Sequence, residues 1–350
     1  MSEPVVVGMS GGVDSTYAVI ALQEQGYEPI GVSLKLPVWD SDKNVICENR
    51  CCTQESLDVA KHVCEQLGVP HHVYEAEESF KDEVIGYIID ELRDGKTPNP
   101  CTVCNRNFKF SKLLEWADQH NVNYVATGHY ARVRYNEQTK KYELLKGKDE
   151  TKDQSYGLAY LSQAQLSRII LPLGDGDKQE VIQTVITKGF TAYKKKKESQ
   201  DFCFVGKKAY QDFLQEEIGV KEGNIVDKQG NILGQHQGVH FYTIGQKKGL
   251  RLPAKHYVIK KENDRVVVSA DKKDLEKKTI LLEKVSFIAG EPPALPLRVT
   301  ARIRYGQPLK RATLQEGYKI VFEEPQAAVT PGQFCVFYSE DVCLGCGVIE

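Results

Sequence analysis

The sequence lacks an apolar run long enough to cross a bilayer, which excludes a transmembrane helix within it. It also lacks an excess of either charge: the formal net charge of the 350 residues is −2, so any nucleic-acid partner must be held by local basic patches. No basic stretch precedes the apolar run Val5-Val6-Val7, so we see no secretory signal and expect a cytoplasmic protein without a membrane partner. Apart from four lysines at 194–197, which by default form a solvated face, there are no repeats or low-complexity segments.

The composition is that of a globular protein with free thiols. Hydrophobic residues make up 41% and charged residues 27% of the chain, and its length favours more than one domain. Ten cysteines without a signal peptide indicate a reducing compartment, where thiols serve chemistry or bind metal.

Strand-like and helix-like segments alternate up to about residue 206, which favours a parallel sheet covered by helices on both faces. Short strand-like runs separated by turns follow, and these predict small β domains with a barrel at the C-terminus. We expect domains at 1–206, 207–276 and 277–350. In the first domain we expect strands at 5–7, 30–36, 72–74 and 124–127, and helices at 16–25, 55–67, 80–93, 108–120, 155–170 and 178–188.

The most informative motif follows the first strand and reads Ser10-Gly11-Gly12-Val13-Asp14-Ser15. Glycines between a strand and a helix let the backbone approach a phosphate, and the helix N-terminus favours an anion. We expect Ser15 to cap that helix. The motif is neither a Walker A loop nor a three-glycine dinucleotide fingerprint. Loops 9–14, 36–54 and 128–130 would meet at one sheet edge, where ligands of such sheets bind.

A second motif, Thr97-Pro98-Asn99-Pro100-Cys101-Thr102-Val103-Cys104-Asn105, suggests thiol chemistry. Two prolines stiffen the approach, and Asn105 can cap the following helix. Cys104 would then lie at a helix N-terminus, which makes a thiol more acidic and nucleophilic. Cys203 stands between aromatic residues after the lysine run, whose charges also favour a thiolate.

Other interpretations of the cysteines stay open at this point. Cys203 alone reads as a small buried apolar side chain. The pair Cys101 and Cys104 could be half of a zinc site completed by Cys343 and Cys346. We interpret Cys47, Cys51 and Cys52 on the 36–54 loop as surface thiols in preference to a sulfur-entry site.

Taken together, these motifs resemble those of the bacterial-type tRNA-specific 2-thiouridylases, in the ATP-pyrophosphatase (PP-loop) superfamily. The similarity runs nearly end to end, through 10–15, 97–105, 126–130, 152–156, 199–204, 234–250 and 327–350. It implies a nucleotide-binding domain of adenine nucleotide α-hydrolase type followed by two smaller, mostly β domains, the last a barrel. It also implies ATP-dependent replacement of O2 of the wobble uridine of tRNA by sulfur, with release of AMP and pyrophosphate.

The resemblance further implies residue roles. Cys203 would carry a persulfide from a sulfur-relay protein fed by a cysteine desulfurase, Cys104 would be the second catalytic cysteine, and Asp14 would help place Mg²⁺. ATP would contact Gly8, Met9, Ser10, Gly11, Gly12, Val13, Asp14, Ser15, Leu34 and Gly128. The tRNA would contact Asn99, Pro100, Cys101, His129, Lys152, Asp153, Gln154, Arg304, Tyr305 and Gln333.

The chain departs from the family at Cys101, where many members carry aspartate. With cysteine there, Cys101, Cys104 and Cys203 could hold a [4Fe–4S] cluster as an alternative sulfur carrier, since thiolates are the usual cluster ligands. Two further alternatives are an adenylating amidoligase with the same loop and a zinc-stabilised RNA-binding protein. The first needs neither catalytic cysteine, and the second predicts tight zinc without pyrophosphate release.

Overall fold

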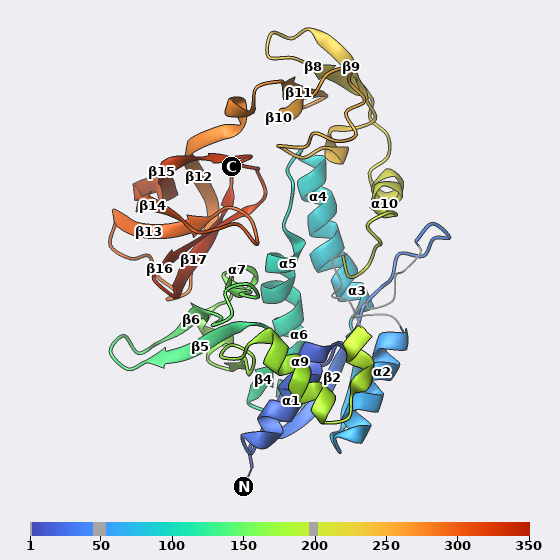
Figure 1. Cartoon of the computed structure of the whole chain (residues 1–350), viewed down its shortest axis with the longest axis vertical. Helices are drawn as coiled ribbons and strands as arrows, with labels where there is room; N and C mark the ends of the chain where they lie inside the picture. Colours follow the sequence, from blue (N-terminus) through green and yellow to red (C-terminus); the bar gives the residue numbers. More distant parts are fainter. Residues whose placement is uncertain (1, 45–53, 196–201) are drawn as a thin grey trace.

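The structure, a computed structural model, describes residues 2–44, 54–195 and 202–350. These residues form three sheets: a five-stranded parallel sheet, a small four-stranded sheet, and a large antiparallel sheet that closes into a barrel (Figure 1). Within these ranges no helix has both the length and the apolar character needed to cross a membrane. The predicted fold class, a parallel-sheet α/β unit followed by two smaller mostly β units with a barrel last, is confirmed.

The parallel sheet has the order β3-β2-β1-β4-β7. Its strands are β1 (Pro4–Gly8), β2 (Glu28–Lys35), β3 (His71–Glu75), β4 (Tyr124–Ala126) and β7 (Ile169–Ile170). Successive side chains of β1 face opposite sides, as a strand requires. Val6 packs in one cluster with α6 (Phe110–Gln119), whereas Val5 and Val7 pack in another with α1 (Val13–Glu24), α2 (Gln54–Gln66) and α9 (Lys178–Thr187). Helices therefore cover both faces.

A continuous helical segment connects the second motif to this sheet. It comprises α5 (Pro100–Val103), the π-helical stretch η2 (Cys104–Lys109) and α6. The expected start at 108 with Asn105 as cap is wrong, because Asn99 is the N-cap and its Oδ1 accepts the Thr102 N–H at 3.3 Å. Pro100 fits the first turn, where its missing N–H costs nothing. Cys104 therefore lies one turn inside the helix.

A second π-helical stretch packs against η2. It is η1 (Lys81–Gly86), which lies between α3 (Glu77–Phe80) and α4 (Tyr87–Arg93). The rings of Phe80 and Phe108 meet edge to face, with centroids 5.1 Å apart. π-helical stretches are rare and concentrate at functional sites. The contact between two of them therefore makes the region around Cys104 a candidate functional site.

The helix expected at 155–170 is wrong. Two single turns, α7 (Ser155–Leu158) and α8 (Gln163–Leu166), precede β7 there. Ser162 starts α8 as its N-cap and forms a capping box with Gln165, so the chain begins a new helix instead of extending the first. Strand β7 then pairs with β4 at the edge of the parallel sheet.

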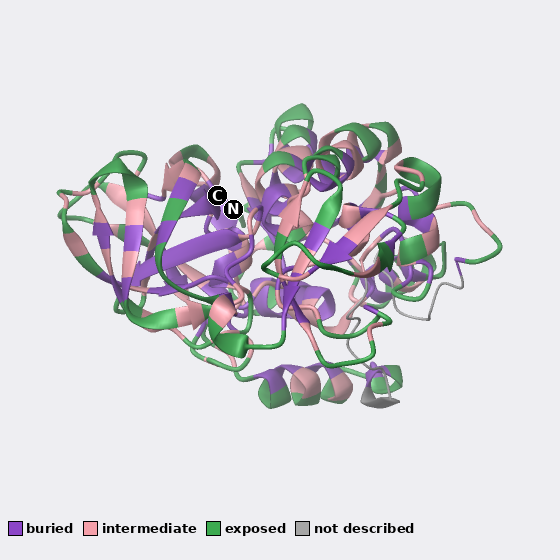
Figure 2. Ribbon diagram, turned by 90° about the horizontal axis from the view of Figure 1, so that it is seen from above, coloured by how far each residue is buried: buried purple, intermediate pink, exposed green. Residues whose placement is uncertain are grey.

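The C-terminal barrel has six strands and is closed by the pairing of β12 with β17. Its strands are β12 (Glu276–Phe287), β13 (Leu297–Arg302), β14 (Lys310–Gln315), β15 (Lys319–Ala327), β16 (Phe334–Ser339) and β17 (Val342–Ile349). Figure 2 shows buried residues along these strands. A hairpin from the N-terminal half, β5 (Ala131–Asn136) and β6 (Lys141–Lys146), extends the barrel sheet because β6 pairs with β17.

The four-stranded sheet lies between these units along the chain and follows α10 (Tyr210–Glu217). Its order is β10-β11-β8-β9, with β8 (Gly223–Val226), β9 (Ile232–His236), β10 (Tyr257–Glu262) and β11 (Arg265–Ser269). It has its own apolar cluster, which includes Ile225, Val258, Val266 and Val268.

Candidate functional site

The loop between β1 and α1 has the geometry of an anion site. Helix α1 starts at Val13 with Gly12 as its N-cap, and no side chain caps it. Ser15 is therefore not the cap; it lies in the first turn, where its hydroxyl donates to the Gly12 carbonyl at 3.0 Å. The first amides of an α-helix have no partner within the helix, so an anion can accept their hydrogen bonds. Gly11 has φ of +68°, and a Cβ there would lie 2.6 Å from the Ser56 carbonyl oxygen.

Hydroxyl groups hold this loop in place. The hydroxyls of Ser10 and Ser15 lie 3.3 Å apart. Buried Tyr193, from η3 (Thr191–Lys195), donates to the Gly11 carbonyl at 3.1 Å and lies 3.0 Å from the Thr16 hydroxyl. The loop is therefore fixed from a segment far along the chain before any ligand arrives.

Asp14 forms an ion pair that sequence reasoning missed. Its Oδ1 accepts from Lys178 Nζ at 2.6 Å and from the Tyr130 hydroxyl at 3.0 Å. The Lys178 side chain is 7% exposed, so this is a nearly buried cation at the start of α9. Gly128 packs directly on the same residue, since a Cβ at Gly128 would lie 2.6 Å from the Asp14 carbonyl carbon. The only sequence signal for Lys178 is its place just after the helix cap Asp177.

The other residues expected near the nucleotide lie at the same sheet edge. Leu34 is half-buried near the end of β2, the neighbour of β1. His129 is half-buried, with its Nδ1 2.7 Å from the Thr127 hydroxyl. Burial lowers the pKa of His129 well below its usual range, and Lys109 adds to the effect. Its imidazole is therefore neutral near pH 7 and offers hydrogen bonds but no charge.

Cys104 and Cys203 pack against one hydrophobic cluster. Its buried members include Phe80, Phe108 and Phe204, and both cysteines, far apart in sequence, lie against this cluster. Cys101 is exposed. Among the residues that the structure describes, no three His, Cys, Asp or Glu side chains are grouped to hold a metal ion. The arrangement thus brings two thiols to one apolar cluster, and it favours neither the iron–sulfur nor the zinc alternative.

The cysteine site and the anion loop are joined by the helix that contains η2 and α6. Leu113 of α6 packs against the end of β1, with its Cδ1 3.0 Å from the position that a Gly8 Cβ would take. One continuous helical segment therefore runs from Cys104 to the end of β1, where the anion loop begins.

The acidic Cys104 expected from a helix N-terminus is not found. Burial raises its pKa to about 11, and the opposing influence of Lys109 is smaller. The reason is the helix start at Pro100, which puts Cys104 beyond the first-turn amides and beside the aromatic cluster. The resting thiol is therefore protonated.

We predict that alkylation of Cys104 by iodoacetamide is slow at pH 7 and accelerates about tenfold per pH unit, because only the thiolate reacts. The rise should continue toward the pKa of about 11. Peptide mass spectrometry of the ATP-free protein between pH 7 and 10 measures the rate, with denatured protein as the control. A rate that levels off near pH 7 contradicts the raised pKa.

Several residues expected to contact tRNA are committed to internal contacts. Asp153 is 6% exposed and its carboxylate pairs with Arg302, so its side chain is held in an internal ion pair. Arg304 donates to the carbonyls of Ile244 and Ala328, both at 3.2 Å. Gln333 donates to the carbonyls of Thr97 and Pro98.

The remaining members of that set are more accessible. Tyr305 is 55% exposed, and its ring lies 6.1 Å from that of Tyr156. Asn99, Pro100, Lys152 and Gln154 are partly exposed. Cys47, Cys51, Cys52 and the end of the lysine run lie outside the described residues.

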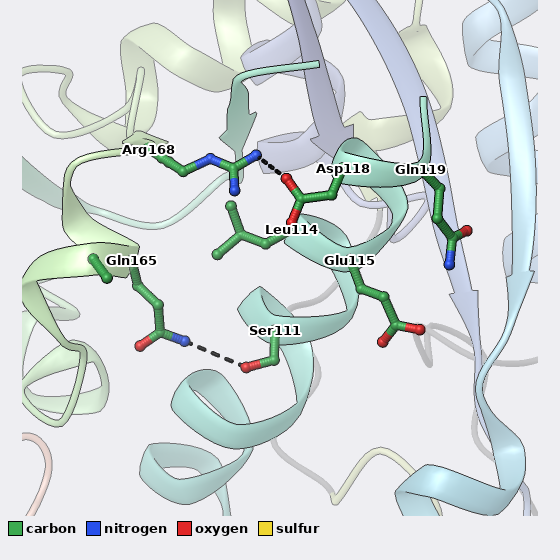
Figure 3. A pocket seen from close by; sticks show the side chains of 8 residues that line it. Ser111, Leu114, Glu115, Asp118, Gln119, Gln165 and Arg168 are labelled. Carbon is green, nitrogen blue, oxygen red and sulfur yellow. Dashed lines mark hydrogen bonds and ion pairs between the residues drawn. The ribbon is translucent and has the colours of Figure 1, made fainter. Parts of the chain in front are cut away.

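A cleft of about 470 Å³ lies elsewhere, between α6 and α8 (Figure 3). Its lining includes Ser111, Asp118 and Arg168, and the last two form an ion pair at 2.6 Å. None of the expected site residues lines it.

The fold and the loop define a class: a nucleotide-binding α/β protein with a PP-loop, extended by two β units. Family models match in the same order: a tRNA methyl transferase HUP domain at 3–207, a tRNA methyl transferase PRC-barrel domain at 211–270 and an aminomethyltransferase beta-barrel domain at 277–349. The chain belongs to the tRNA-specific 2-thiouridylase family.

Relatives carrying that name match over their full length. The "tRNA-specific 2-thiouridylase MnmA" of Clostridioides difficile (strain 630) is 41% identical, with 100% of this chain and 99% of the relative covered. That of Moorella thermoacetica is 43% identical, with 99% of each covered. A solved "4-thiouridine synthetase - RNA complex with bound ATP" is 13% identical with a TM-score of 0.37, covering 62% of this chain and 50% of the other, too little similarity to compare sites.

Proposed function

We propose that this protein is an ATP-dependent sulfurtransferase that converts the wobble uridine of tRNA to 2-thiouridine. The observation that carries the proposal is the meeting of Cys104 and Cys203 on one cluster, in the unit that also holds the anion loop. Membership of the family over the whole chain supports the substrate. A C–N-forming ligase would need the loop but neither cysteine.

The first step makes the C2 oxygen of uridine replaceable. That oxygen is a poor leaving group, so it attacks the α-phosphorus of ATP, and pyrophosphate departs. The glycine loop and the α1 N-terminus suit the departing pyrophosphate, because no side chain caps the helix and its first amides can donate to an anion. The product is a uridine whose O2 is joined to AMP.

The second step transfers sulfur. A persulfide on Cys203 attacks C2, AMP leaves with the former O2, and the base becomes linked to Cys203 through a disulfide. The Cys104 thiolate then attacks the Cys203 sulfur, which frees 2-thiouridine and leaves a Cys104–Cys203 disulfide. The two cysteine thiols thus supply the two electrons that reduce the transferred sulfur, and an external thiol must later reduce the disulfide.

Cys104 must lose its proton for this attack, although its resting pKa is about 11. We infer that Lys109 assists this deprotonation, because its positive charge lowers the Cys104 pKa against the larger effect of burial. Because the protonated thiol reacts slowly, the resting Cys104 is also protected from oxidation.

Mg²⁺ bound with ATP would neutralise phosphate charge, and Asp14 is the acidic residue at the loop that could hold it. The fit is restricted, since Asp14 Oδ1 already accepts from Lys178 and Tyr130. One carboxylate with phosphate oxygens and water is nevertheless a common Mg²⁺ environment. A [4Fe–4S] cluster fits less well, because Cys101, Cys104 and Cys203 are not grouped as ligands.

The tRNA would present its anticodon loop between the cysteines and the barrel. Single-stranded loops already splay their bases, which lowers the cost of extruding one into a pocket. Exposed Tyr305 offers an aromatic face for stacking. The proposed contacts are Asn99, Pro100, Cys101, His129, Lys152, Asp153, Gln154, Arg304, Tyr305 and Gln333, with the carboxylate of Asp153 already paired with Arg302.

We also infer domain limits at 1–206, 207–276 and 277–350, a cytoplasmic location, and sulfur delivery by a relay protein fed by a cysteine desulfurase. The matched family segments support these limits. A persulfide on the relay protein is a suitable sulfur donor to Cys203, because sulfur exchange between a thiolate and a persulfide needs no cofactor.

The experiment is a thiolation assay on anaerobically purified protein. We expect 2-thiouridine by nucleoside mass spectrometry, with AMP and pyrophosphate released in equal amount, only when tRNA, ATP, Mg²⁺ and a persulfide donor are all present. Iron and acid-labile sulfide are measured on the same sample. Activity that requires stoichiometric iron contradicts the persulfide route, and ATP cleavage without thiolated tRNA contradicts the function.

A further inference from the structure

The segment 96–98, just before the helix that carries Cys104, is held by the barrel. Thr97 N–H donates to the Pro331 carbonyl at 2.8 Å. Gln333 Nε2 donates to the carbonyls of Thr97 and Pro98, at 2.9 and 3.1 Å. Gly332 approaches so closely that a Cβ there would lie 3.0 Å from the Thr97 nitrogen and oxygen. The barrel therefore fixes one side of this segment.

The four-stranded sheet holds the other side through one side chain. Lys261 of β10 reaches out of its sheet, and its Nζ donates to the Lys96 carbonyl at 3.2 Å and to the Thr97 hydroxyl at 3.4 Å. Its third partner is the Tyr242 carbonyl, at 3.0 Å, in its own unit. Three N–H groups of one ammonium are thus matched by three acceptors that span two units.

All three acceptors are neutral. Nowhere in the described ranges does a carboxylate lie within ion-pair distance of Lys261, and burial lowers the pKa of Lys261 to about 8. It therefore keeps its proton at neutral pH. An ammonium taken from water without a counter-charge is unfavourable, so the three hydrogen bonds of Lys261 have to offset that cost. What the lysine provides in return is the hold that these bonds place on the segment 96–98.

The segment needs donors from outside. Pro98 and Pro100 have no N–H, so the backbone before the helix offers carbonyls and few donors to hold itself. Lys261 and Gln333 supply hydrogen bonds to those carbonyls from two directions. The next residue, Asn99, caps α5, so the orientation of 96–98 sets where the helix begins and where Cys104 points.

We propose that Lys261 is a positioning residue, through which the four-stranded sheet fixes segment 96–98 and thereby aims Cys104 at the base. The proposal rests on the proposed function for its chemistry, but the fixation of the segment can be measured without activity. The small sheet then acts on the reaction itself, in addition to any contact with tRNA.

The test compares Lys261→Met with Lys260→Met. Lys260 precedes Lys261 on β10, but its side chain is 67% exposed and pairs with Glu262. For Lys261→Met we expect alkylation of Cys104 in ATP-free protein to be about tenfold faster, because charged hydrogen bonds that restrain the segment are lost. We expect kcat for thiolation to fall by about tenfold to 100-fold, with KM for ATP and tRNA unchanged, because a misaimed nucleophile slows only the chemical step. Lys260→Met should match the wild type in both.

The outcomes separate the two proposals. Alkylation of Lys261→Met at the wild-type rate overturns the positioning role, and so does a raised KM for tRNA at unchanged kcat, which assigns Lys261 to tRNA binding. If the wild type does not thiolate tRNA, the proposed function fails, yet faster alkylation still supports the restraint of segment 96–98. If Lys261→Met does not fold, as judged by circular dichroism, Lys261→Gln replaces it. Alkylation of Cys104 and the kinetics of thiolation are then measured on Lys261→Gln, with the same results supporting or overturning the proposal.

Discussion

Cys104→Ser and Cys203→Ser are each expected to lose thiolation by about 1000-fold or more, the scale seen when a nucleophile is removed. Both should bind ATP as the wild type does, since neither residue belongs to the loop at 8–15. The two variants should nevertheless stop at different stages, because the two thiols act in sequence.

With Cys203→Ser, no persulfide forms on the enzyme, so pyrophosphate can be released but tRNA stays unlinked to protein. With Cys104→Ser, the persulfide on Cys203 can still attack C2, but nothing resolves the product. We expect a covalent protein–tRNA species joined through a disulfide, which dithiothreitol releases as 2-thiouridine-containing tRNA.

Denaturing gels with labelled tRNA, run with and without dithiothreitol, distinguish these states. Cys101→Ala serves as the third protein: it should keep activity on the persulfide route and lose iron and activity together if a cluster carries the sulfur. Full activity of either serine variant removes that cysteine from the mechanism. A dithiothreitol-sensitive adduct with Cys203→Ser instead of Cys104→Ser reverses the assigned order.

The features that could be predicted from sequence depend on neighbouring residues. The β-branched run of β1 and the glycine pair after it specify a strand, a loop and a helix start within a few positions, so the anion loop could be identified directly. The alternation of strands and helices likewise fixes a parallel sheet, because parallel strands need crossovers.

The features that could not be predicted depend on distant partners. Lys178 meets Asp14 and Tyr193 meets Gly11 only after the sheet has formed, and neither lies in a motif. The hairpin β5–β6 reads as part of the first unit, yet it completes its hydrogen bonding on β17. The pKa of Cys104 could not be predicted for the same reason. It depends on the helix start at Pro100 and on an aromatic cluster built from three separate segments.

Asp153 provides the largest expected effect on stability. Its carboxylate accepts from the backbone N–H groups of Gly147 and Ser155, at 3.1 and 3.0 Å, and pairs with Arg302 of the barrel strand β13. Arg302 also donates to the Tyr338 hydroxyl at 2.9 Å. Asp153 and Arg302 are 6% and 8% exposed, so this ion pair crosses from the N-terminal unit to the barrel almost without water.

Asp153→Ala should therefore destabilise the protein by about 3–5 kcal/mol, because it leaves the guanidinium of Arg302 buried without its counter-charge. Scanning calorimetry should show a transition lowered by on the order of 10 °C. The matched control is Asp341→Ala, which removes a 59% exposed aspartate that pairs with Arg132 and Lys146 and should cost about 1 kcal/mol or less. The double variant Asp153→Leu/Arg302→Met should regain much of the loss, since removing both charges removes the desolvation penalty with them. If Asp153→Ala unfolds no earlier than Asp341→Ala, the pair does not hold the barrel to the nucleotide-binding unit.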